Sequence, residues 1–156
     1  MRHWTFAPVV AVLLVLLTAS SALAGGNGAT SFTETEHGAV EEFVDVVPCQ
    51  EDLGQFNLTL TYNGVFHQTI GPKSAHFTFT QTGTFVAVST GDGPTFTGHF
   101  TIWGGFNENN RNTNGTFTFS LHGTSSDGTK VKFNGVEHFS VSATGVVNEF
   151  VIENCH

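Results

Sequence analysis

Phenylalanine and threonine alternate in several stretches of this sequence, and that alternation constrains the fold more than any other feature. HFTFTQ, TFTGHFTIW and TFTFSLH carry apolar side chains at every second residue, with hydroxyl or histidine side chains between them. A period of two residues is typical of a half-buried β-strand, and no stretch shows the longer period of an amphipathic helix. The sequence therefore predicts an all-β fold whose strands have one apolar face and one hydroxylated face.

Glycine-containing turn motifs separate these stretches and set the expected number of strands. Asn63-Gly64 predicts a type I′ hairpin turn, and Thr82-Gly83 predicts a second break in the chain. We expect about eight or nine strands, at 40–47, 55–62, 65–70, 75–81, 84–90, 95–104, 116–122, 130–142 and 146–153. Short connections without helices favour a single antiparallel up-and-down β-barrel, and a two-sheet β-sandwich is the alternative.

The first 24 residues have the pattern of a secretory signal peptide. Arg2 and His3 precede an apolar run of about 11 residues, and small residues follow up to Ala24. A helix that spans a membrane needs about 20 apolar residues. We therefore expect cleavage after Ala24, a secreted protein without a membrane span, a flexible segment at 25–37 and one barrel domain at 38–156.

The net charge restricts the expected partners, and the two cysteines bear on the expected compartment. Five Lys and Arg stand against 13 Asp and Glu, which gives a formal net charge of −8. Nucleic-acid binding depends on neutralising phosphates with Lys and Arg, so this acidic chain is not expected to bind nucleic acid. Cys49 and Cys155 are the two cysteines, and in an oxidising compartment they predict one disulfide bond.

Common catalytic and cofactor motifs are absent from the sequence, so no cofactor is expected. One candidate for chemistry is an acid–base pair. A hairpin turn at residues 63–64 would place His67 on the apolar face, where Glu137 could be its partner. A bulge at residues 134–135 would turn Glu137 outward and bring His138 inward instead.

A second candidate is a metal site on the hydroxylated face. Strands 95–104 and 116–122 can pair only in registers that place His99 and His122 opposite or diagonal to each other. Two imidazoles at that spacing could hold a divalent metal, but the sequence offers no evident third ligand. Exposed histidines without a metal are the alternative interpretation.

The Asn-rich stretch GGFNENNRNTNGTF, residues 104–117, is the expected recognition surface. We expect a connection of about 11 residues there, longer than the 2–5 residues usual in a hairpin loop. Aromatic rings beside amides are typical of sugar and peptide recognition, although the same residues also suit a plain loop. The candidate ligand-binding residues are Trp103, Phe106, Asn107, Asn109, Asn110 and Asn112.

The motifs LTYNGVFH, GHFTIWGGF, GTFTFSLHGTSSDGT and VEHFSVSATG resemble those of small secreted actinobacterial β-rich proteins of unknown function. The resemblance covers nearly the whole chain after residue 24 and includes the two cysteines. It implies a bacterial, secreted, β-rich protein and carries no activity, cofactor or site residue. In plan, the expected barrel is also similar to lipocalin-like and allene oxide cyclase-like barrels, although no lipocalin signature motif is present, and this similarity concerns the fold alone.

Export, a single apolar core and the missing catalytic motifs favour a secreted, non-enzymatic binding protein. Its partner would be a small apolar ligand in the barrel mouth, or a glycan or protein at the loops. One alternative is a small cyclase- or isomerase-type enzyme with a pocket at His67 and Glu137. Another is a structural component of the cell envelope or the extracellular space.

Overall fold

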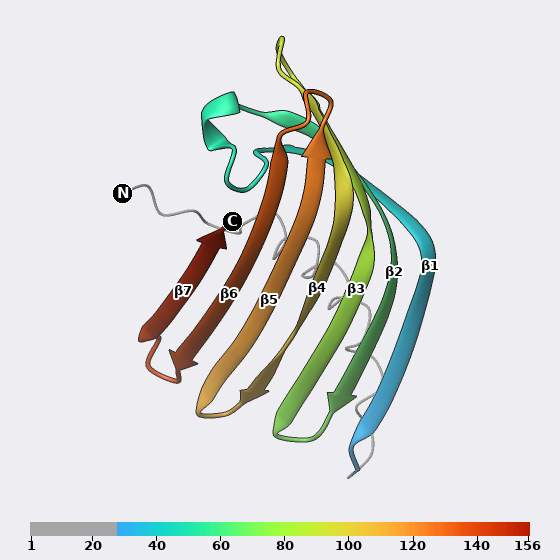
Figure 1. The fold of residues 1–156 in the computed structure, drawn as a ribbon. Coiled ribbons are helices and arrows are strands. Elements are labelled where there is room, and N and C mark those ends of the chain that lie inside the picture. The colour runs from blue at the N-terminus through green and yellow to red at the C-terminus, as the bar shows by residue number, and fades with distance from the viewer. Residues whose placement is uncertain (1–27) are drawn as a thin grey trace.

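The computed structural model describes residues 28–156, so the expected signal peptide at 1–24 lies outside the described residues. Seven strands form one antiparallel sheet in which chain neighbours are also neighbours in space (Figure 1). They are β1 (Thr30–Asp45), β2 (Phe56–Ile70), β3 (Ser74–Ser89), β4 (Thr95–Asn109), β5 (Asn112–Ser125), β6 (Lys130–Ser142) and β7 (Val147–Cys155). One 3-10 turn, η2 (Glu51–Leu53), lies between β1 and β2. No helix in the described part of the chain has the length and apolar character to cross a membrane.

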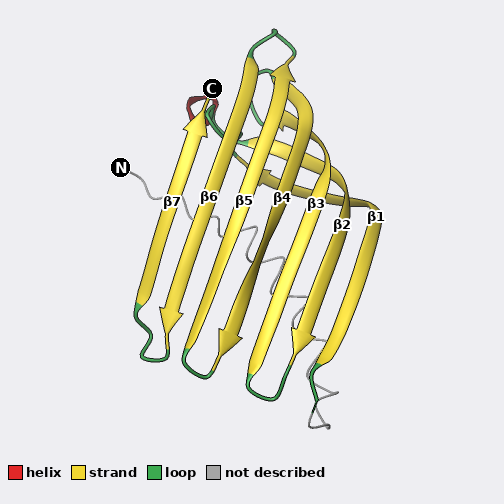
Figure 2. Ribbon diagram, turned by 60° about the horizontal axis from the view of Figure 1, so that its bottom comes forward, coloured by secondary structure: helices red, strands yellow, loops and turns green. Residues whose placement is uncertain are grey.

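The all-β, up-and-down prediction is confirmed, but the sheet is not closed into a barrel. β1 pairs with β2 and β7 pairs with β6, while β1 and β7 form no ladder with each other (Figure 2). Because all seven strands belong to one sheet, the sandwich alternative is not formed either. Closure would require a ladder between the two edge strands, and β7 has 9 residues whereas β1 has 16.

The predicted turns at Asn63-Gly64 and Thr82-Gly83 are wrong, because both motifs lie inside long strands, β2 and β3. A type I′ turn needs a positive φ at both central residues, and Gly64 is not among the described glycines with a positive φ. A Cβ atom added to Gly83 would lie 2.1 Å from the carbonyl oxygen of Thr61. Glycine at 83 therefore permits close packing of two strands, and the two mergers reduce nine expected strands to seven.

Asn63 does not form a turn, and its side chain instead stabilises the edge strand β1. The pairing of β1 with β2 shifts register between Glu36 and Ala39, as in a β-bulge. Gly38 lies in this bulge with a φ of 62°, and its backbone nitrogen donates to Asn63 Oδ1 at 3.0 Å. The segment that we expected to be flexible, 25–37, thus contributes strand residues from Thr30 onward.

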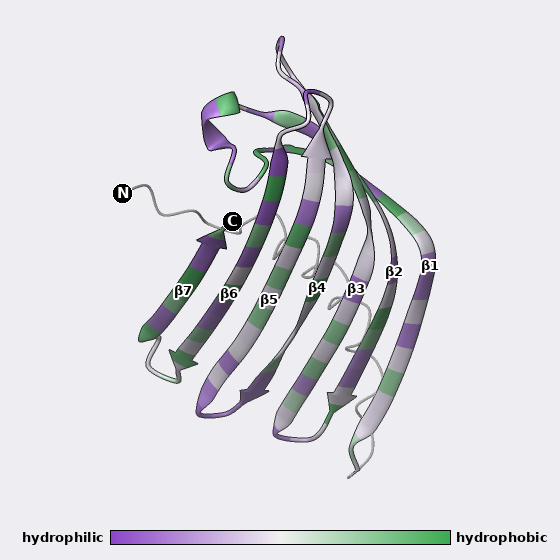
Figure 3. Cartoon of the chain, viewed as in Figure 1, coloured by the Kyte–Doolittle hydropathy of each residue, from purple (hydrophilic) through white to green (hydrophobic). Residues whose placement is uncertain are grey.

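Apolar and polar residues alternate along the strands, as the banding in Figure 3 shows, so the two faces of the sheet differ in composition. We call the face that carries Phe56, Phe85 and Phe96 the inner face, and the opposite one the outer face. Every second residue of each strand lies on the inner face, because side chains alternate across a strand. The inner face holds the buried core, and the outer face holds most of the threonine hydroxyls and the strand histidines.

The core is most completely buried at the end of the sheet where β1 ends and β2 begins, which we call the closed end. Val47, Phe56, Phe85 and Phe96 have 0% to 1% of their surface exposed there. The rings of Phe56 and Phe96 meet edge to face, with centroids 5.7 Å apart. The opposite end, with the β2–β3, β4–β5 and β6–β7 turns, is called the open end.

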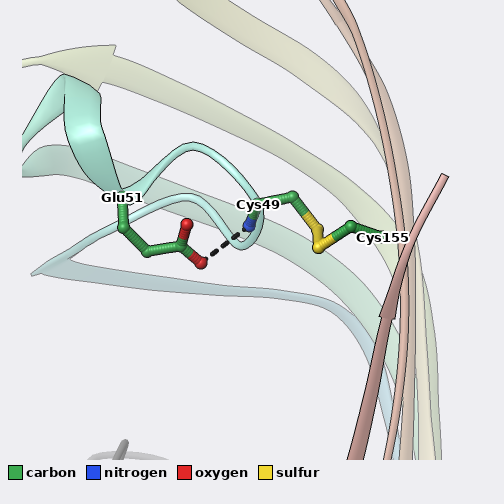
Figure 4. The surroundings of a disulfide bond; sticks show 3 residues. All are labelled: Cys49, Glu51 and Cys155. Carbon is green, nitrogen blue, oxygen red and sulfur yellow. Dashed lines mark hydrogen bonds between the residues drawn. A yellow bond between two sulfur atoms is a disulfide. The ribbon is translucent and has the colours of Figure 1, made fainter. Parts of the chain in front are cut away.

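The predicted disulfide bond between Cys49 and Cys155 is confirmed. It joins the β1–β2 connection to the last residue of β7, with 5.8 Å between the two Cα atoms (Figure 4). Glu51 supports the connection, since its Oε1 accepts a hydrogen bond from the Cys49 backbone nitrogen at 2.9 Å. The disulfide therefore links covalently the two sides of the sheet that no backbone ladder joins.

Candidate functional site

A chain of phenylalanine rings crosses the inner face from β2 to β6. Neighbouring rings in it have centroids 5.4 to 6.4 Å apart, within the range of favourable aromatic contact. The rings belong to Phe66, Phe77, Phe79, Phe106, Phe117 and Phe139. Phe77 and Phe79 are buried, whereas Phe117 and Phe139 are half-buried. The ring chain thus leads from the buried middle of the sheet toward the exposed strand β7.

Glutamates flank this ring chain on both sides of the inner face. By register they are Glu34, Glu36 and Glu41 of β1, Glu108 of β4, Glu137 of β6, and Glu149 and Glu153 of β7. No Lys or Arg of the described residues lies on this face. Lys73 and Arg111 occupy turns, and Lys130 and Lys132 point to the outer face. The inner face is consequently both aromatic and negatively charged.

Glu137 lies directly beside the ring chain. It pairs with Phe117 on β5 and with Val151 on β7, and its side chain is half-buried. Burial raises the pKa of its carboxyl group, and the negative charge of Glu149 raises it further. Both causes disfavour the carboxylate, so a positive charge placed beside Glu137 would be favourable.

A second acidic group lies beside the bulge in β1. The hydroxyl of Tyr62 donates to Glu41 Oε1 at 2.7 Å, and Oε2 of Glu36 is buried without a hydrogen-bond partner in the described part of the chain. Burial, and then the hydrogen bond to Glu41, raise the pKa of the Tyr62 hydroxyl above its ordinary range. This corner of the inner face therefore has hydrogen-bond acceptors and lacks a positive charge among the described residues.

On the outer face, three histidines at the open end have polar partners. Thr33 Oγ1 lies 2.8 Å from Nδ1 of His67, and Thr116 Oγ1 lies 2.9 Å from Nδ1 of His138. His76 Nδ1 is bonded to Asn107 Oδ1. These imidazoles are part of cross-strand hydrogen-bond ladders, which gives each of them a structural role.

The structure places His99 directly opposite His122 on the outer face, one of the two registers expected from the sequence. Neither imidazole has a hydrogen-bond partner among the described residues. Within residues 28–156, no cluster of three His, Cys, Asp or Glu side chains could hold a metal ion. The pair is therefore close but lacks the third ligand of a typical zinc site.

The predicted acid–base pair is not brought together. Because β2 is continuous, His67 falls on the outer face, whereas register places Glu137 on the inner face. No register shift occurs at residues 134–135, so His138 stays on the outer face. The proposed His67 and Glu137 pocket is wrong because the sheet itself separates the two side chains.

The Asn-rich stretch is a pair of strands joined by a tight turn, so the expected loop of about 11 residues is wrong. β4 continues to Asn109, β5 begins at Asn112, and only Asn110 and Arg111 connect them. Asn109 Oδ1 accepts hydrogen bonds from the backbone nitrogens of Arg111 and Asn112, at 2.8 and 3.2 Å. These amides therefore stabilise the turn itself.

Trp103 and Phe106 lie on opposite faces of β4, so they do not flank a common site. Phe106 belongs to the inner ring chain, where it contacts Phe77. Trp103 is 52% exposed on the outer face, between Thr80 of β3 and Thr118 of β5. Of the predicted aromatic pair, Trp103 alone shares a face with Asn107.

The glutamates of β7 are functional candidates that the sequence analysis missed. The same alternation that places Glu137 inside also places Glu149 between Val147 and Val151 on the inner face. Their signal was the strand period in VNEFVIE, which could have been extended across β7.

No protein-family model, no curated protein and no solved structure matches this chain.

Proposed function

We propose that this chain is an exported, non-enzymatic binding protein whose inner face holds an apolar ligand that carries a positive charge. The observation that supports it most directly is the inner face itself, where a continuous chain of rings is flanked by glutamates and lacks Lys and Arg among the described residues. Export is supported by the signal-like pattern of residues 1–24 and by the disulfide, since disulfides persist in oxidising compartments.

The rings supply the apolar part of the interaction. Phe117 and Phe139 are half-buried, and Phe139 of β6 lies beside β7, where the inner side chains of Val147 and Val151 are exposed. Burial of this apolar surface by a ligand would contribute roughly 25 cal/mol for each Å² removed from water. An alkyl or aryl group fits this requirement.

The glutamates supply the preference for positive charge. A cation over an aromatic face gains about 0.5 to 2 kcal/mol, more when it is desolvated. Glu137 lies across the strands from Phe117, so one ammonium group can meet both a ring and a carboxylate. The unpartnered Oε2 of Glu36 offers a further acceptor at the other side of the sheet. An anionic ligand would meet repulsion from both sides.

A head-group series tests this proposal. Dodecyltrimethylammonium, dodecyl maltoside and laurate carry similar alkyl chains and differ in charge, and their binding is measured by calorimetry below their micelle concentrations. We expect the cation to bind at least about tenfold more tightly than the anion, because opposite charge within a few ångströms changes such equilibria by that order. Equal binding of the three would contradict the proposed charge preference.

Paired variants locate the site. Glu137→Gln and Glu149→Gln should each weaken binding of the cation and leave the neutral maltoside unchanged. Glu42→Gln is the matched control, because Glu42 lies on the outer face of β1, opposite Thr59. If Glu42→Gln weakened cation binding as much as Glu137→Gln, the effect would come from net charge and not from the inner face.

The mass of the protein recovered from the medium of an expression host tests export. We expect a chain that begins after Ala24 and gains two hydrogens on reduction of the Cys49–Cys155 bond. A chain that keeps residues 1–24 and stays with the cells would contradict export.

Glycan binding at the outer face is a second candidate, favoured by the exposure of Trp103 between two threonines. An indole ring can cover the apolar face of a sugar while the hydroxyls of Thr80 and Thr118 exchange hydrogen bonds with it. The two candidates use opposite faces of the sheet. Trp103→Ala should therefore abolish retention on a glycan array and leave binding of the dodecyl cation intact.

A further inference from the structure

The outer face has a shallow hollow near the closed end, with a volume of about 720 Å³. Strands β3, β4, β5 and β6 form its floor. Its polar lining includes Thr84, His99, His122, Thr124, Lys130 and Lys132. None of these side chains belongs to the inner face or to the ring chain, so the hollow is independent of the proposed ligand site.

Register arranges the lining in rows that cross the strands. Thr84 of β3 pairs with His99 of β4, His99 with His122 of β5, and His122 with Lys132 of β6. Thr124 and Lys130 pair in a parallel row. Because adjacent strands are about 4.8 Å apart, the row from His99 to Lys132 spans about 10 Å.

Positive charge is concentrated here, in a chain whose net charge is −8. Of the five Lys and Arg, Arg2 precedes the described residues, and two of the remaining four, Lys130 and Lys132, line this hollow. No carboxylate lines it. Among residues 28–156 neither lysine side chain has an ion-pair partner.

The carboxylates of Asp127 and Glu42 form no ion pair with Lys130 or Lys132. Asp127, in the β5–β6 turn, is bonded to Ser125 and to the backbone nitrogen of Thr129, which lower the pKa of its carboxyl to about 2. Glu42 of β1 lies two strands away from β3, with β2 between them.

His156 is the titratable group at the far end of the row. Its backbone nitrogen donates to the Lys132 carbonyl at 3.0 Å. The strand residues on the β3 side are Thr84 and Val86, which do not titrate.

The histidines of the hollow differ from the other strand histidines in one respect. His67, His76 and His138 are each bonded to a neighbouring hydroxyl or amide, whereas His99 and His122 have no protein partner in the described part of the chain. The ring nitrogens of His99 and His122 can therefore donate to a bound molecule, together with the ammonium groups of Lys130 and Lys132.

We propose that this hollow is a binding site for a sulfate or phosphate oxyanion, either free or carried as an ester. Two ammonium groups, two imidazoles and threonine hydroxyls can surround such a group with hydrogen-bond donors, and charge-assisted donors bind oxyanions most strongly. A positively charged imidazole is a stronger donor to an anion than a neutral one, so the site binds its anion more tightly in mildly acidic medium.

Sulfate is the probe that tests this site, because its charge does not change between pH 5.5 and 8. Binding is followed by NMR of the histidine side chains in the oxidised protein, at constant ionic strength set with chloride. We expect resonances of His99 and His122 to shift on titration, and the affinity to rise about tenfold between pH 8 and pH 5.5, because positive charge on the imidazoles adds attraction for the anion within a few ångströms. Parallel titration with a sugar 6-sulfate distinguishes a free ion from an ester.

Variants separate the contributions of lysine and histidine. Lys132→Gln should lower the affinity for sulfate about tenfold at pH 8, whereas Lys73→Gln, in the β2–β3 turn, should leave it unchanged. The double variant His99→Gln/His122→Gln should keep the pH 8 affinity and lose the rise at pH 5.5. His76→Gln is the control histidine. All of these side chains are exposed, and unchanged melting temperatures would show that the variants fold.

Two results would overturn the proposal. One is that chloride shifts the His99 and His122 resonances as strongly as sulfate does, since that would reflect screening alone. The other is that the rise in affinity at pH 5.5 persists in the double histidine variant.

Discussion

The closed and open ends of this sheet follow the same alternating pattern, yet they are stabilised differently. At the closed end, Phe56 and Phe96 are fully buried, Val47 covers them from the β1–β2 connection, and the disulfide holds that connection to β7. At the open end, Phe32 of β1 and Val147 at the start of β7 are each 59% exposed. The pattern of a strand thus defines its apolar face, whereas the connections decide whether that face is covered.

Because of this difference, the closed end stabilises the fold, whereas the open end offers a surface for binding. The fully buried rings contribute to the free energy of folding at the closed end, while half-buried rings at the open end keep apolar surface that a ligand can still remove from water. Glu137 and Glu149 support the same division, because they lie toward the open half of β6 and β7. A binding surface can exist there because the core at the other end maintains the fold.

Removal of the disulfide should have the largest effect on this comparison. The double variant Cys49→Ser/Cys155→Ser opens a loop with a sequence separation of 106 residues. In the chain-entropy model a loop of that size contributes roughly 4.7 kcal/mol. We expect a loss of about that size in the free energy of unfolding, measured by urea denaturation.

Hydrogen exchange gives this prediction its spatial test. Amides of residues 46–55 and of β7 should lose protection before those of β3 and β4, because the disulfide restrains the former directly. The reduced wild-type protein is the control and should behave as the double variant does. A stability loss below about 1 kcal/mol would mean that the closed end is held by packing alone.

A matched pair of phenylalanine truncations should have the next largest effect. Phe96→Ala removes a fully buried ring at the closed end and should cost about 3–5 kcal/mol. Phe117→Ala removes a half-buried ring nearer the open end and should cost roughly half as much, since less of its surface leaves water on folding. Urea denaturation of both variants measures the difference.

For ligand binding, the two variants should rank in the opposite order from their losses of stability. Phe117→Ala should weaken binding of the dodecyl cation, and Phe96→Ala should leave it unchanged wherever the variant is folded. Equal losses of stability for the two truncations would remove the distinction between the two ends.

Alternation predicted the all-β class and the two faces, because strand period is a local property of sequence. It left two positions open for Glu137, and the uninterrupted pairing of β5 with β6 places this residue on the inner face. The pairing of His99 with His122 followed from the same reasoning. The disulfide could be predicted since two cysteines allow one intramolecular pairing. These successes required no knowledge of how far each strand extends.

Strand length is where the sequence analysis failed. Asn63-Gly64 has the composition of a hairpin turn, but the partner strand β1 contains a bulge at Gly38 whose backbone nitrogen needs the Asn63 side chain. Gly83 allows close approach to Thr61 instead of a turn. Such contacts with a neighbouring strand cannot be inferred from a short stretch of sequence. Because one turn was misplaced, His67 was predicted on the wrong face. Barrel closure failed similarly, because closure depends on pairing between the first and last strands.

The smallest effect that we predict concerns Glu137 at the open end. Because burial and Glu149 raise the pKa of this carboxyl, the folded state favours its protonated form. The stability that the group contributes is fully present below its ordinary pKa of 4.5 and is lost as the pH rises through the higher value of the folded state. Glu137→Gln keeps the neutral shape at every pH. It should therefore be slightly more stable than the wild type at pH 7, by no more than about 0.5 kcal/mol.

Urea denaturation at pH 7 and at pH 4 measures this difference. The advantage of Glu137→Gln should shrink at pH 4, where the wild-type carboxyl is largely protonated in the folded state. Glu42→Gln, on the outer face, removes one charge without touching the inner face and controls for net charge. If Glu137→Gln were less stable than the wild type at pH 7, the carboxylate would have a favourable partner in the folded protein. The negative charge of the inner face would then already be balanced by that partner, and the preference for a cationic ligand would lose its physical basis.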